Sequence, residues 1–374
     1  MRILVATVTA GGGHIQAAAA LQETWKMVFP DDEVKRVDLL DLVPKLQRKV
    51  YAEGYVKLVE HAPELYELFF KKTDNPKRLR QLATFRRRFA EHTNRKFVRY
   101  FRQFDPQAVL CTHFLPLEVL GSLKGRRGSS DFPFTACVIT DFEAHALWME
   151  PVVDLYCVAA DETKARLVAR AVQTERVAVT GIPVAARFSE IPNVAGLRRR
   201  FGLRDDLPTL LVLGGGFGMG PVAGILAALD RVEREFQTVV VAGKNLELRR
   251  KLAAEDRRHP THVLGFVTNM HEWMAAADLI VTKPGGLTSA EALALGKPLF
   301  ILNPIPGQES ANSDFLLERG AAVKVNRIED VPFRIEQLLG SVKYNKKMSA
   351  AARLIGRPDA ARVICATVAE RVRR

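Results

Sequence analysis

Long apolar runs and clustered cysteines are both missing from this chain of 374 residues. No apolar run approaches the roughly 20 residues that a membrane-spanning helix needs, so we expect no transmembrane segment. The four cysteines are scattered without a CxxC spacing, and three of them fall in apolar, strand-like runs. We therefore expect buried thiols in a reducing cytoplasm, and neither a disulfide framework nor a cysteine metal site.

Complete nucleotide-binding fingerprints are missing as well. The N-terminal run MRILVATV is followed by no cleavage-like site and predicts a first strand, which leads into the turn Gly11-Gly12-Gly13-His14. With Gly11 and Gly13 in the first two positions of GxGxxG, the last position holds Gln16, which disfavours a nicotinamide or flavin site. No GxxxxGK followed by Ser or Thr occurs, which excludes a P-loop NTPase, and no Asp-x-Asp ends a predicted strand.

The chain does contain a regular alternation of strand-like and helix-like segments. Its apolar fraction of 48% and charged fraction of 26% are those of a soluble globular protein, and its length suits two domains. Helical patterns, including 15–29 and a C-terminal helix 349–373, separate the strands, so both halves are predicted to be α/β with doubly wound sheets. The strands are predicted at 2–8, 34–40, 108–112, 134–140 and 155–159 in the first half, and at 209–213, 238–242, 262–266, 278–282 and 298–302 in the second.

His14 stands at or just inside the start of the helix 15–29, at the carboxyl edge of the first predicted sheet. Ligands of open α/β sheets collect at this edge. A positive helix end lowers the pKa of a nearby imidazole, which suits a general base that takes a proton from a hydroxyl near pH 7. The alternative is a histidine that only caps the helix.

The stretch 265–312 predicts a strand-turn-helix-strand unit with ligand-binding chemistry. Pro284-Gly285-Gly286 precedes a helix whose start, Thr288 to Glu291, fits a capping box and whose end is marked by Gly296. Backbone N–H groups are uncovered at such a helix start and the dipole favours negative charge, so an anion such as diphosphate fits there. After the second strand, a proline-stiffened loop presents groups suited to hydroxyls, namely Gln308, Glu309 and Asn312.

A second glycine-rich turn opens the other half of the chain, from Gly214 to Gly220. Glycines allow a backbone to come very close to a ligand, and the turn leads into a helix predicted to run to about Glu235. The predicted strand 262–266 ends at Phe266-Val267, whose backbone groups are placed to meet a nucleobase.

In the first half, the predicted strand 134–140 is followed by a loop that carries Asp141, His145 and Trp148. Loops at the carboxyl edge of a sheet often bear function, so these residues are candidates for an acceptor site. The alternative is structural, with the aspartate capping a turn and the tryptophan buried.

Acidic residues are scarce between Lys77 and Arg102, where ten basic residues stand against the single acid Glu91 and supply +9 of the net charge of +13. An apolar, aromatic stretch precedes this segment, and rings combined with Lys and Arg are typical of an element that lies on an anionic membrane. The alternative is a solvated helix whose aromatics fill the core, and nucleic acid is disfavoured because no binding module accompanies the patch. The interleaved rings are Phe85, Phe89, Phe97, Tyr100 and Phe101.

Five motifs, taken together, resemble the bacterial and plant monogalactosyldiacylglycerol synthase and diacylglycerol glucosyltransferase family. They are GGGH at 11–14, TDFEAHALW at 140–148, GGGFGMGP at 214–221, the stretch 265–293 and PIPGQESAN at 304–312. The similarity covers nearly the whole chain and is weakest between residues 44 and 130.

This resemblance implies the GT-B architecture, in which two Rossmann-like, doubly wound domains face each other across a cleft. The implied divisions are an N-terminal acceptor and membrane-binding domain at 1–185, a UDP-sugar donor domain at 186–348, and a C-terminal helix at 349–374 that packs back on the first domain.

The resemblance also implies the reaction, an inverting transfer of a hexose from a UDP-sugar to a lipid hydroxyl, with diacylglycerol as the expected acceptor and no metal or cofactor. It makes His14 the base, Phe266 the uracil contact through its backbone, and Glu291 the ribose ligand, a role that competes with capping. The turns at Gly214 and Gly285 flank the diphosphate, and Gln308 and Glu309 hold sugar hydroxyls. The predicted donor set is Gly13, Gly214, Gly215, Gly216, Phe266, Val267, Pro284, Gly285, Gly286, Leu287, Thr288, Glu291, Gln308, Glu309 and Asn312.

One departure from the family is Phe217, where the plant members carry an acid. The expected location is cytoplasmic, on the inner face of the plasma membrane, with the basic segment on anionic lipid and no nucleic-acid partner. Three other functions stay open: transfer to another lipid such as a polyprenyl-linked sugar, a UDP-sugar epimerase of the same architecture, and a non-catalytic surface-binding protein with a degenerate nucleotide site.

Overall fold

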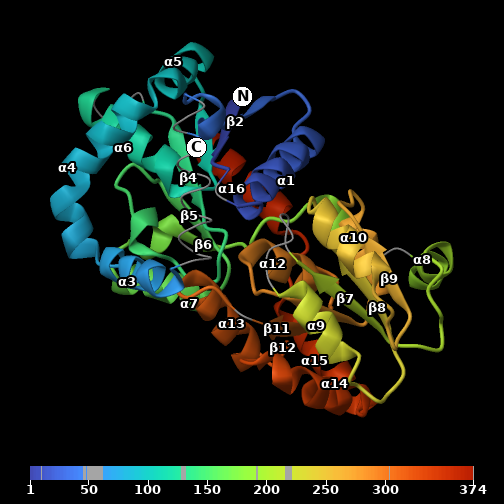
Figure 1. Ribbon diagram of the computed structural model, residues 1–374. Helices are drawn as coiled ribbons and strands as arrows, with labels where there is room; N and C mark the ends of the chain where they lie inside the picture. Colours follow the sequence, from blue (N-terminus) through green and yellow to red (C-terminus); the bar gives the residue numbers. More distant parts are fainter. Residues whose placement is uncertain are drawn as a thin grey trace. The chain divides into compact units, whose positions relative to one another are not determined.

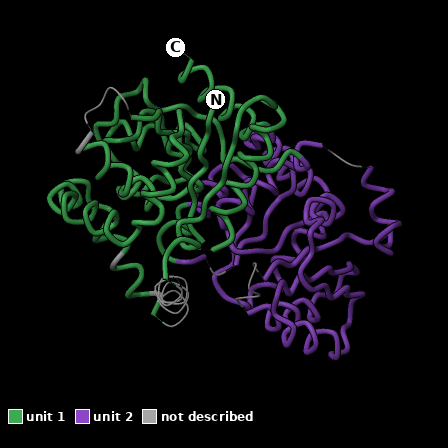
Figure 2. The backbone as a smooth tube through the Cα atoms, turned by 90° about the horizontal axis from the view of Figure 1, so that it is seen from above, with its two compact units in different colours: residues 1–186, 306–311, 359–374 green, residues 187–305, 312–358 purple. Residues whose placement is uncertain are grey.

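The structure is a computed structural model that describes residues 1–9, 11–44, 48, 62–127, 132–190, 193–214, 221–302 and 304–373. The chain forms two compact units, drawn in green and purple in Figure 2. Unit 1 comprises Met1–Ala186, Pro306–Ala311 and Asp359–Arg374, and unit 2 comprises Arg187–Ile305 and Asn312–Pro358. Each unit contains one six-stranded sheet with flanking helices (Figure 1), which confirms the predicted α/β class.

The sheet of unit 1 has the strand order β2-β1-β3-β4-β5-β6, and all of its strands pair in parallel. Such pairing requires helical crossovers between strands, as the alternating pattern predicts. Five of the six strands match the predicted ones to within two residues at each end. The strands are β1 (Arg2–Thr7), β2 (Glu33–Asp38), β3 (Ala108–Cys111), β4 (Phe134–Val138), β5 (Leu155–Val158) and β6 (Val177–Val179).

Helices cover both faces of this sheet. Alternate residues of β1 point to opposite faces, so Ile3 joins one hydrophobic core with the last helix of the chain, while Leu4 joins another with α5 and α6. The helices of unit 1 are α1 (Gly13–Val28), α3 (Pro63–Thr73), α4 (Pro76–Thr93), α5 (Arg95–Phe104), α6 (Phe114–Arg127), α7 (Asp161–Ala169) and α16 (Ala360–Arg373), with short 3-10 turns η1 (Leu39–Asp41), η2 (Ala146–Trp148), η3 (Thr174–Arg176) and η4 (Ala186–Phe188).

The sheet of unit 2 is also parallel throughout, in the order β12-β11-β10-β7-β8-β9. Its strands are β7 (Thr209–Leu213), β8 (Gln237–Val241), β9 (Thr261–Leu264), β10 (Leu279–Thr282), β11 (Leu299–Leu302) and β12 (Ala322–Val325). The remaining elements are α8 (Val194–Arg200), α9 (Val222–Leu229), α10 (Leu246–Ala254), α11 (Met270–Ala276), α12 (Gly286–Ala294), α13 (Gln308–Glu318), η5 (Ile328–Asp330), α14 (Val331–Leu339) and α15 (Val342–Ile355).

Two predicted helices have the wrong extent. The helix expected to run to about Glu235 ends at Leu229. The single C-terminal helix expected at 349–373 is two helices, α15 and α16, separated at Gly356-Arg357-Pro358. Proline lacks an N–H and disfavours a helical residue before it, so the break occurs where the chain passes from unit 2 back to unit 1.

Candidate active site

His14 is the second residue of α1, and groups from three neighbouring strand ends surround it. Gly11 in the preceding turn has φ = 83°, which favours glycine, and the N-cap Gly12 offers no side chain to the helix. Thr112, directly after β3, places its Oγ1 3.0 Å from the backbone oxygen of His14. Thr140, two residues after β4, places its Oγ1 3.0 Å from His14 Nδ1. The His14 side chain is therefore held by Thr140, and capping is not its role.

The surroundings of the His14 ring favour the neutral imidazole. Burial lowers the pKa of His14, and the nearby carboxylate of Asp141 opposes this shift. The ring of His113 meets the His14 ring edge-on, with 4.8 Å between centroids, and the Trp148 ring lies 6.2 Å away. When Nδ1 carries the hydrogen and donates it to Thr140, Nε2 keeps a lone pair that can accept a proton.

His113 and Thr140 were missed by the sequence analysis. His113 is buried, its Nδ1 accepts a hydrogen bond from the Leu115 N–H at 3.1 Å, and burial holds its pKa well below the usual range. It therefore forms an uncharged wall beside His14. A signal was available, because His113 follows one predicted strand and Thr140 ends another, both at the carboxyl edge of the sheet, where Asp141 was also found.

The loop 141–148 divides into two parts. Asp141 and Trp148 lie near His14, as the acceptor-site hypothesis requires. His145 instead supports the structure: its Nδ1 accepts from the Leu147 N–H at 3.1 Å, and its Nε2 lies 3.0 Å from the backbone oxygen of Phe70 in α3. The loop beside His14 is thus attached to α3 through His145.

In unit 2, the turn between β10 and α12 leaves a helix start without a side-chain cap. The N-cap is Gly285, and α12 begins at Gly286, two residues before the predicted capping residue Thr288. The predicted capping box is therefore wrong, because Glu291 is the sixth residue of the helix and lies beyond its first turn. The predicted helix end is confirmed, since Gly296 follows the helix with φ = 64°. The uncapped N–H groups of α12 are suited to an anion.

Glu291 lies among buried residues of α12, and the pKa of its carboxyl differs from the usual value for glutamate. Burial raises the pKa of its carboxyl to about 7, and the positive charge of Arg187 opposes this shift. A glutamate with this pKa is only partly ionised near neutral pH. A ligand that donates hydrogen bonds to the carboxylate would favour its ionised form.

The other predicted donor residues have varied environments. Asn312 is buried, and its amide donates to the Pro284 carbonyl at 3.0 Å, so it supports the turn that precedes α12. Gln308 and Glu309 begin α13, and Gln308 Oε1 accepts from the Tyr66 hydroxyl at 2.7 Å. Phe266 was predicted to end β9, but that strand stops at Leu264.

Phe266 lies in the loop after β9 and is 61% exposed. Among the predicted glycine-rich turn residues, Gly214 follows β7 and donates to the Val241 carbonyl at 3.3 Å. Gly215, Gly216 and Phe217 lie outside the described residues.

The described part of the chain contains no group of three or more His, Cys, Asp or Glu side chains arranged for a metal ion.

The basic segment from Lys77 to Arg102 is not one uniform surface. In α5 the aromatics Phe97 and Phe101 are buried in the core of unit 1, so for them the core alternative is correct. In α4, Phe85 and Phe89 are 72% and 60% exposed and stack on each other. The rings of the preceding apolar stretch that fall within 49–61 lie outside the described residues.

None of the helices in the described ranges combines the length and the apolar character that crossing a bilayer requires.

Two parallel six-stranded sheets, each with a glycine-turn helix start at a strand end, are the architecture of the GT-B class. Solved structures with this fold include MurG from Acinetobacter baumannii, at a TM-score of 0.64 and 15% identity over 99% of both chains. Another is UDP-GlcNAc 2-epimerase from Neisseria meningitidis bound to UDP-GlcNAc, at 0.61 and 14% over 99% of this chain and 100% of that chain. The predicted GT-B fold is confirmed.

Sequence comparison identifies the family within this class. Residues 14–184 match the profile of monogalactosyldiacylglycerol (MGDG) synthase, and residues 196–355 match that of glycosyl transferases group 1. The processive diacylglycerol beta-glucosyltransferase of Bacillus subtilis (strain 168) is 30% identical over 341 residues, which cover 90% of this chain and 87% of that protein. The chain belongs to the monogalactosyldiacylglycerol synthase and processive diacylglycerol glucosyltransferase family, as its motifs predict.

Proposed function

We propose that this protein transfers a hexose from a UDP-sugar to the hydroxyl of diacylglycerol with inversion, giving a β-glycosyl diacylglycerol. The observation that carries this proposal is the similarity, over nine tenths of the chain, to a processive diacylglycerol beta-glucosyltransferase. The His14 site supports it, because attack by a lipid hydroxyl needs a neutral base near pH 7 and burial favours the neutral imidazole.

The acceptor half of the reaction is assigned to unit 1. Nε2 of His14 takes the proton from the acceptor hydroxyl as the oxygen attacks the anomeric carbon. Thr140 fixes the ring through Nδ1, and the imidazolium that forms is stabilised by the nearby Asp141 carboxylate. Trp148 and the uncharged His113 offer an apolar wall for a lipid substrate.

The donor half is assigned to unit 2 together with the residues that begin α13. The uncapped start of α12 stabilises the negative charge of the leaving UDP, a contribution that often dominates transition-state stabilisation. Glu291 accepts hydrogen bonds from the ribose, and the backbone at Phe266 and Val267 meets the uracil. Gln308 and Glu309 hold the sugar hydroxyls. No metal or cofactor takes part in this scheme.

Membrane association is assigned to α4. Phe85 and Phe89 are exposed there beside basic residues, the arrangement of a helix that inserts rings into a membrane surface and binds anionic head groups. The protein would then act on the inner face of the plasma membrane. Its binding to anionic vesicles should decrease as salt is added, because salt screens exposed charges.

The proposed function is tested by incubating the full chain with diacylglycerol vesicles and a series of UDP-sugars, and identifying lipid products by mass spectrometry. A hexosyl diacylglycerol with β configuration is the expected product. Isomerisation of the UDP-sugar without acceptor would instead indicate an epimerase. A product only with polyprenyl-linked sugars would move the acceptor assignment to that lipid class.

A further inference from the structure

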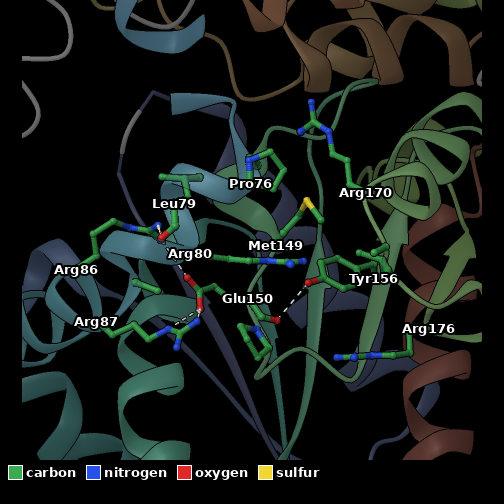
Figure 3. Close-up of a pocket in the computed structure, with 15 residues that line it drawn as sticks. Pro76, Leu79, Arg80, Arg86, Arg87, Met149, Glu150, Tyr156, Arg170 and Arg176 are labelled. Atoms are coloured by element: carbon green, nitrogen blue, oxygen red, sulfur yellow. Dashed lines mark hydrogen bonds and ion pairs between the residues drawn. The ribbon is translucent and has the colours of Figure 1, made fainter. Parts of the chain in front are cut away.

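A cavity of about 220 Å³ lies in unit 1 beneath the inner face of α4, away from His14 and its partners. Its walls come from α4, from the segment around Met149 to Pro151, and from the region of β5 and the residues after α7 (Figure 3). The walls are unusually rich in arginine. The five guanidinium groups belong to Arg80, Arg86, Arg87, Arg170 and Arg176.

Two of these arginines are neutralised by acids of the same unit. Arg86 pairs with Glu118 at 2.7 Å and with Glu150 at 3.0 Å. Arg87 pairs with the other oxygen of Glu150 at 2.7 Å. Because Glu118 and Glu150 are both buried and shared in this way, two cations and two anions balance here.

The positive charge of Arg170 is neutralised by an acid on the opposite side of the cavity. Its guanidinium pairs with Asp74 at 2.6 Å, and Asp74 also accepts from the Ala146 N–H at 2.8 Å. The hydrogen bond from Arg170 and the Ala146 N–H help to lower the pKa of Asp74 against the effect of burial. Asp74 therefore stays ionised and provides no spare charge for another cation.

Arg80 and Arg176 have no such partner among the described residues. Figure 3 shows Arg80 reaching from α4 across the cavity towards Tyr156, and Arg176 entering from the other side. Arg176 is close enough to Tyr156 to oppose the rise that burial causes in the pKa of that phenol. Two cations, one exposed and one half-buried, thus point into one hollow without a counter-ion among the described residues, and a bound anion would relieve their mutual repulsion.

We infer that this cavity binds a phosphate monoester dianion between Arg80 and Arg176. Two unbalanced positive charges match the two negative charges of a phosphate monoester near neutral pH, and guanidinium groups bind phosphate oxygens with paired hydrogen bonds. The same cavity is lined by the apolar side chains of Leu79, Met149 and Val172, which suit a glycerol or acyl portion beside the phosphate. The phosphate group is carried either by a lipid or by a soluble molecule, and the experiment below distinguishes the two.

Calorimetric titration of the full chain at constant ionic strength tests this site. The probes are dihexanoyl phosphatidate below its micelle-forming concentration, glycerol 3-phosphate and inorganic phosphate, with dihexanoyl phosphatidylcholine as the probe without a dianion. The double variant Arg80→Gln/Arg176→Gln should lose at least about tenfold in affinity for the phosphate probes, because it removes charge-assisted hydrogen bonds. Neither side chain makes a hydrogen bond or an ion pair in the described part of the chain, and the two charges repel each other, so the variant should unfold at or above the wild-type temperature.

A matched control is Lys26→Gln/Arg36→Gln, which removes two exposed positive charges of the same unit away from the cavity. It should bind the probes as the wild type does. Tight binding of phosphatidate alone identifies a lipid head group, and equal binding of glycerol 3-phosphate identifies a soluble phosphate ester. Equal affinities in wild type and Arg80→Gln/Arg176→Gln, or no binding of any phosphate probe by the wild type, would overturn the assignment.

Discussion

The turn before α1 and the turn before α12 have the same form, but the helices that they begin carry side chains with opposite acid–base character. Each follows a buried parallel strand, begins a helix at a glycine N-cap and carries a titratable side chain within the first six residues. Burial acts on both side chains, lowering the pKa of His14 and raising that of Glu291 to about 7. One turn thus carries an imidazole whose neutral form is favoured, and the other a carboxyl that ionises near neutral pH.

The difference between the two turns lies in their partners. His14 is fixed by a hydroxyl from a separate strand, Thr140, and faces other rings. In the described part of the chain, the side chain of Glu291 has no hydrogen-bond partner, and the charge of Arg187 opposes the effect of burial on its pKa, so its carboxyl depends on a ligand for hydrogen bonds. We propose that the first turn is prepared before substrate binds, whereas the second is completed by a ligand. Five predictions test this contrast.

The largest effect is expected from His14→Ala, which should lower turnover by at least about a hundredfold, since a general base is typically worth 10² to 10⁴ in rate. The affinity for UDP, measured by calorimetry, should stay near that of the wild type because the donor groups are assigned to other residues. Near-normal turnover in this variant would eliminate His14 as the base.

Glu291→Ala should weaken the binding of UDP-glucose about ten- to a hundredfold, because a hydrogen bond to a charged group contributes about 1.5 to 3 kcal/mol. Calorimetry measures the affinity, and Glu329→Ala, which removes an exposed carboxylate of the same unit, serves as the control. Unchanged affinity in Glu291→Ala would remove this residue from the donor site.

The affinity of the wild type for UDP-glucose should rise about tenfold between pH 6 and pH 8, as the carboxyl with a pKa of about 7 ionises. The diphosphate diester of this ligand does not titrate in that range. Glu291→Gln should show a flat profile.

The free energy of unfolding should change with pH in the direction opposite to the affinity for UDP-glucose. Because the folded pKa of Glu291 lies above its unfolded value, the folded state holds this proton more tightly, and stability falls as pH rises through the interval between the two. Glu291→Gln should therefore raise the unfolding temperature more at pH 8 than at pH 5. The reverse order would show that folding lowers the pKa of this carboxyl instead of raising it.

The smallest effect is expected from Thr140→Val, which should lower turnover about three- to tenfold, the usual range for one neutral hydrogen bond. Thr140→Ser should restore most of the rate. The discriminating measurement is the acid limb of the pH profile of kcat/KM, which reports His14 in the free enzyme and should shift in the valine variant. A rate loss with an unmoved limb would assign Thr140 to packing alone.

Much of the fold was predictable because buried parallel strands are short apolar runs bounded by turn residues. The runs 108–112 and 209–213 became β3 and β7 almost unchanged. The capping box failed because Thr288 and Glu291 fit a local pattern, while the chain had already turned into helix at Gly286. Gly285 adopts the N-cap conformation without a side chain, so the sequence pattern three residues later carried no information about the helix start.

The site was only half predictable, for a related reason. His14 and Glu291 stand in helices that follow recognisable glycine turns, and each of these turns follows a buried strand. The contact between His14 and Thr140 joins residues 126 positions apart, and no local pattern specifies such a pair. The same limit applies to α4 and α5, whose similar basic and aromatic composition gives exposed rings in one helix and core rings in the other.

The return of α16 to unit 1 has a consequence for how the chain folds during synthesis. Ile364, Cys365 and Val368 share a buried cluster with Ile3 and Leu110, so one face of the N-terminal sheet is covered by residues from beyond unit 2. Domains usually fold in the order in which they leave the ribosome. Here the first unit to emerge cannot complete its core until the second has been made, and its uncovered apolar face must be kept from aggregation in the meantime.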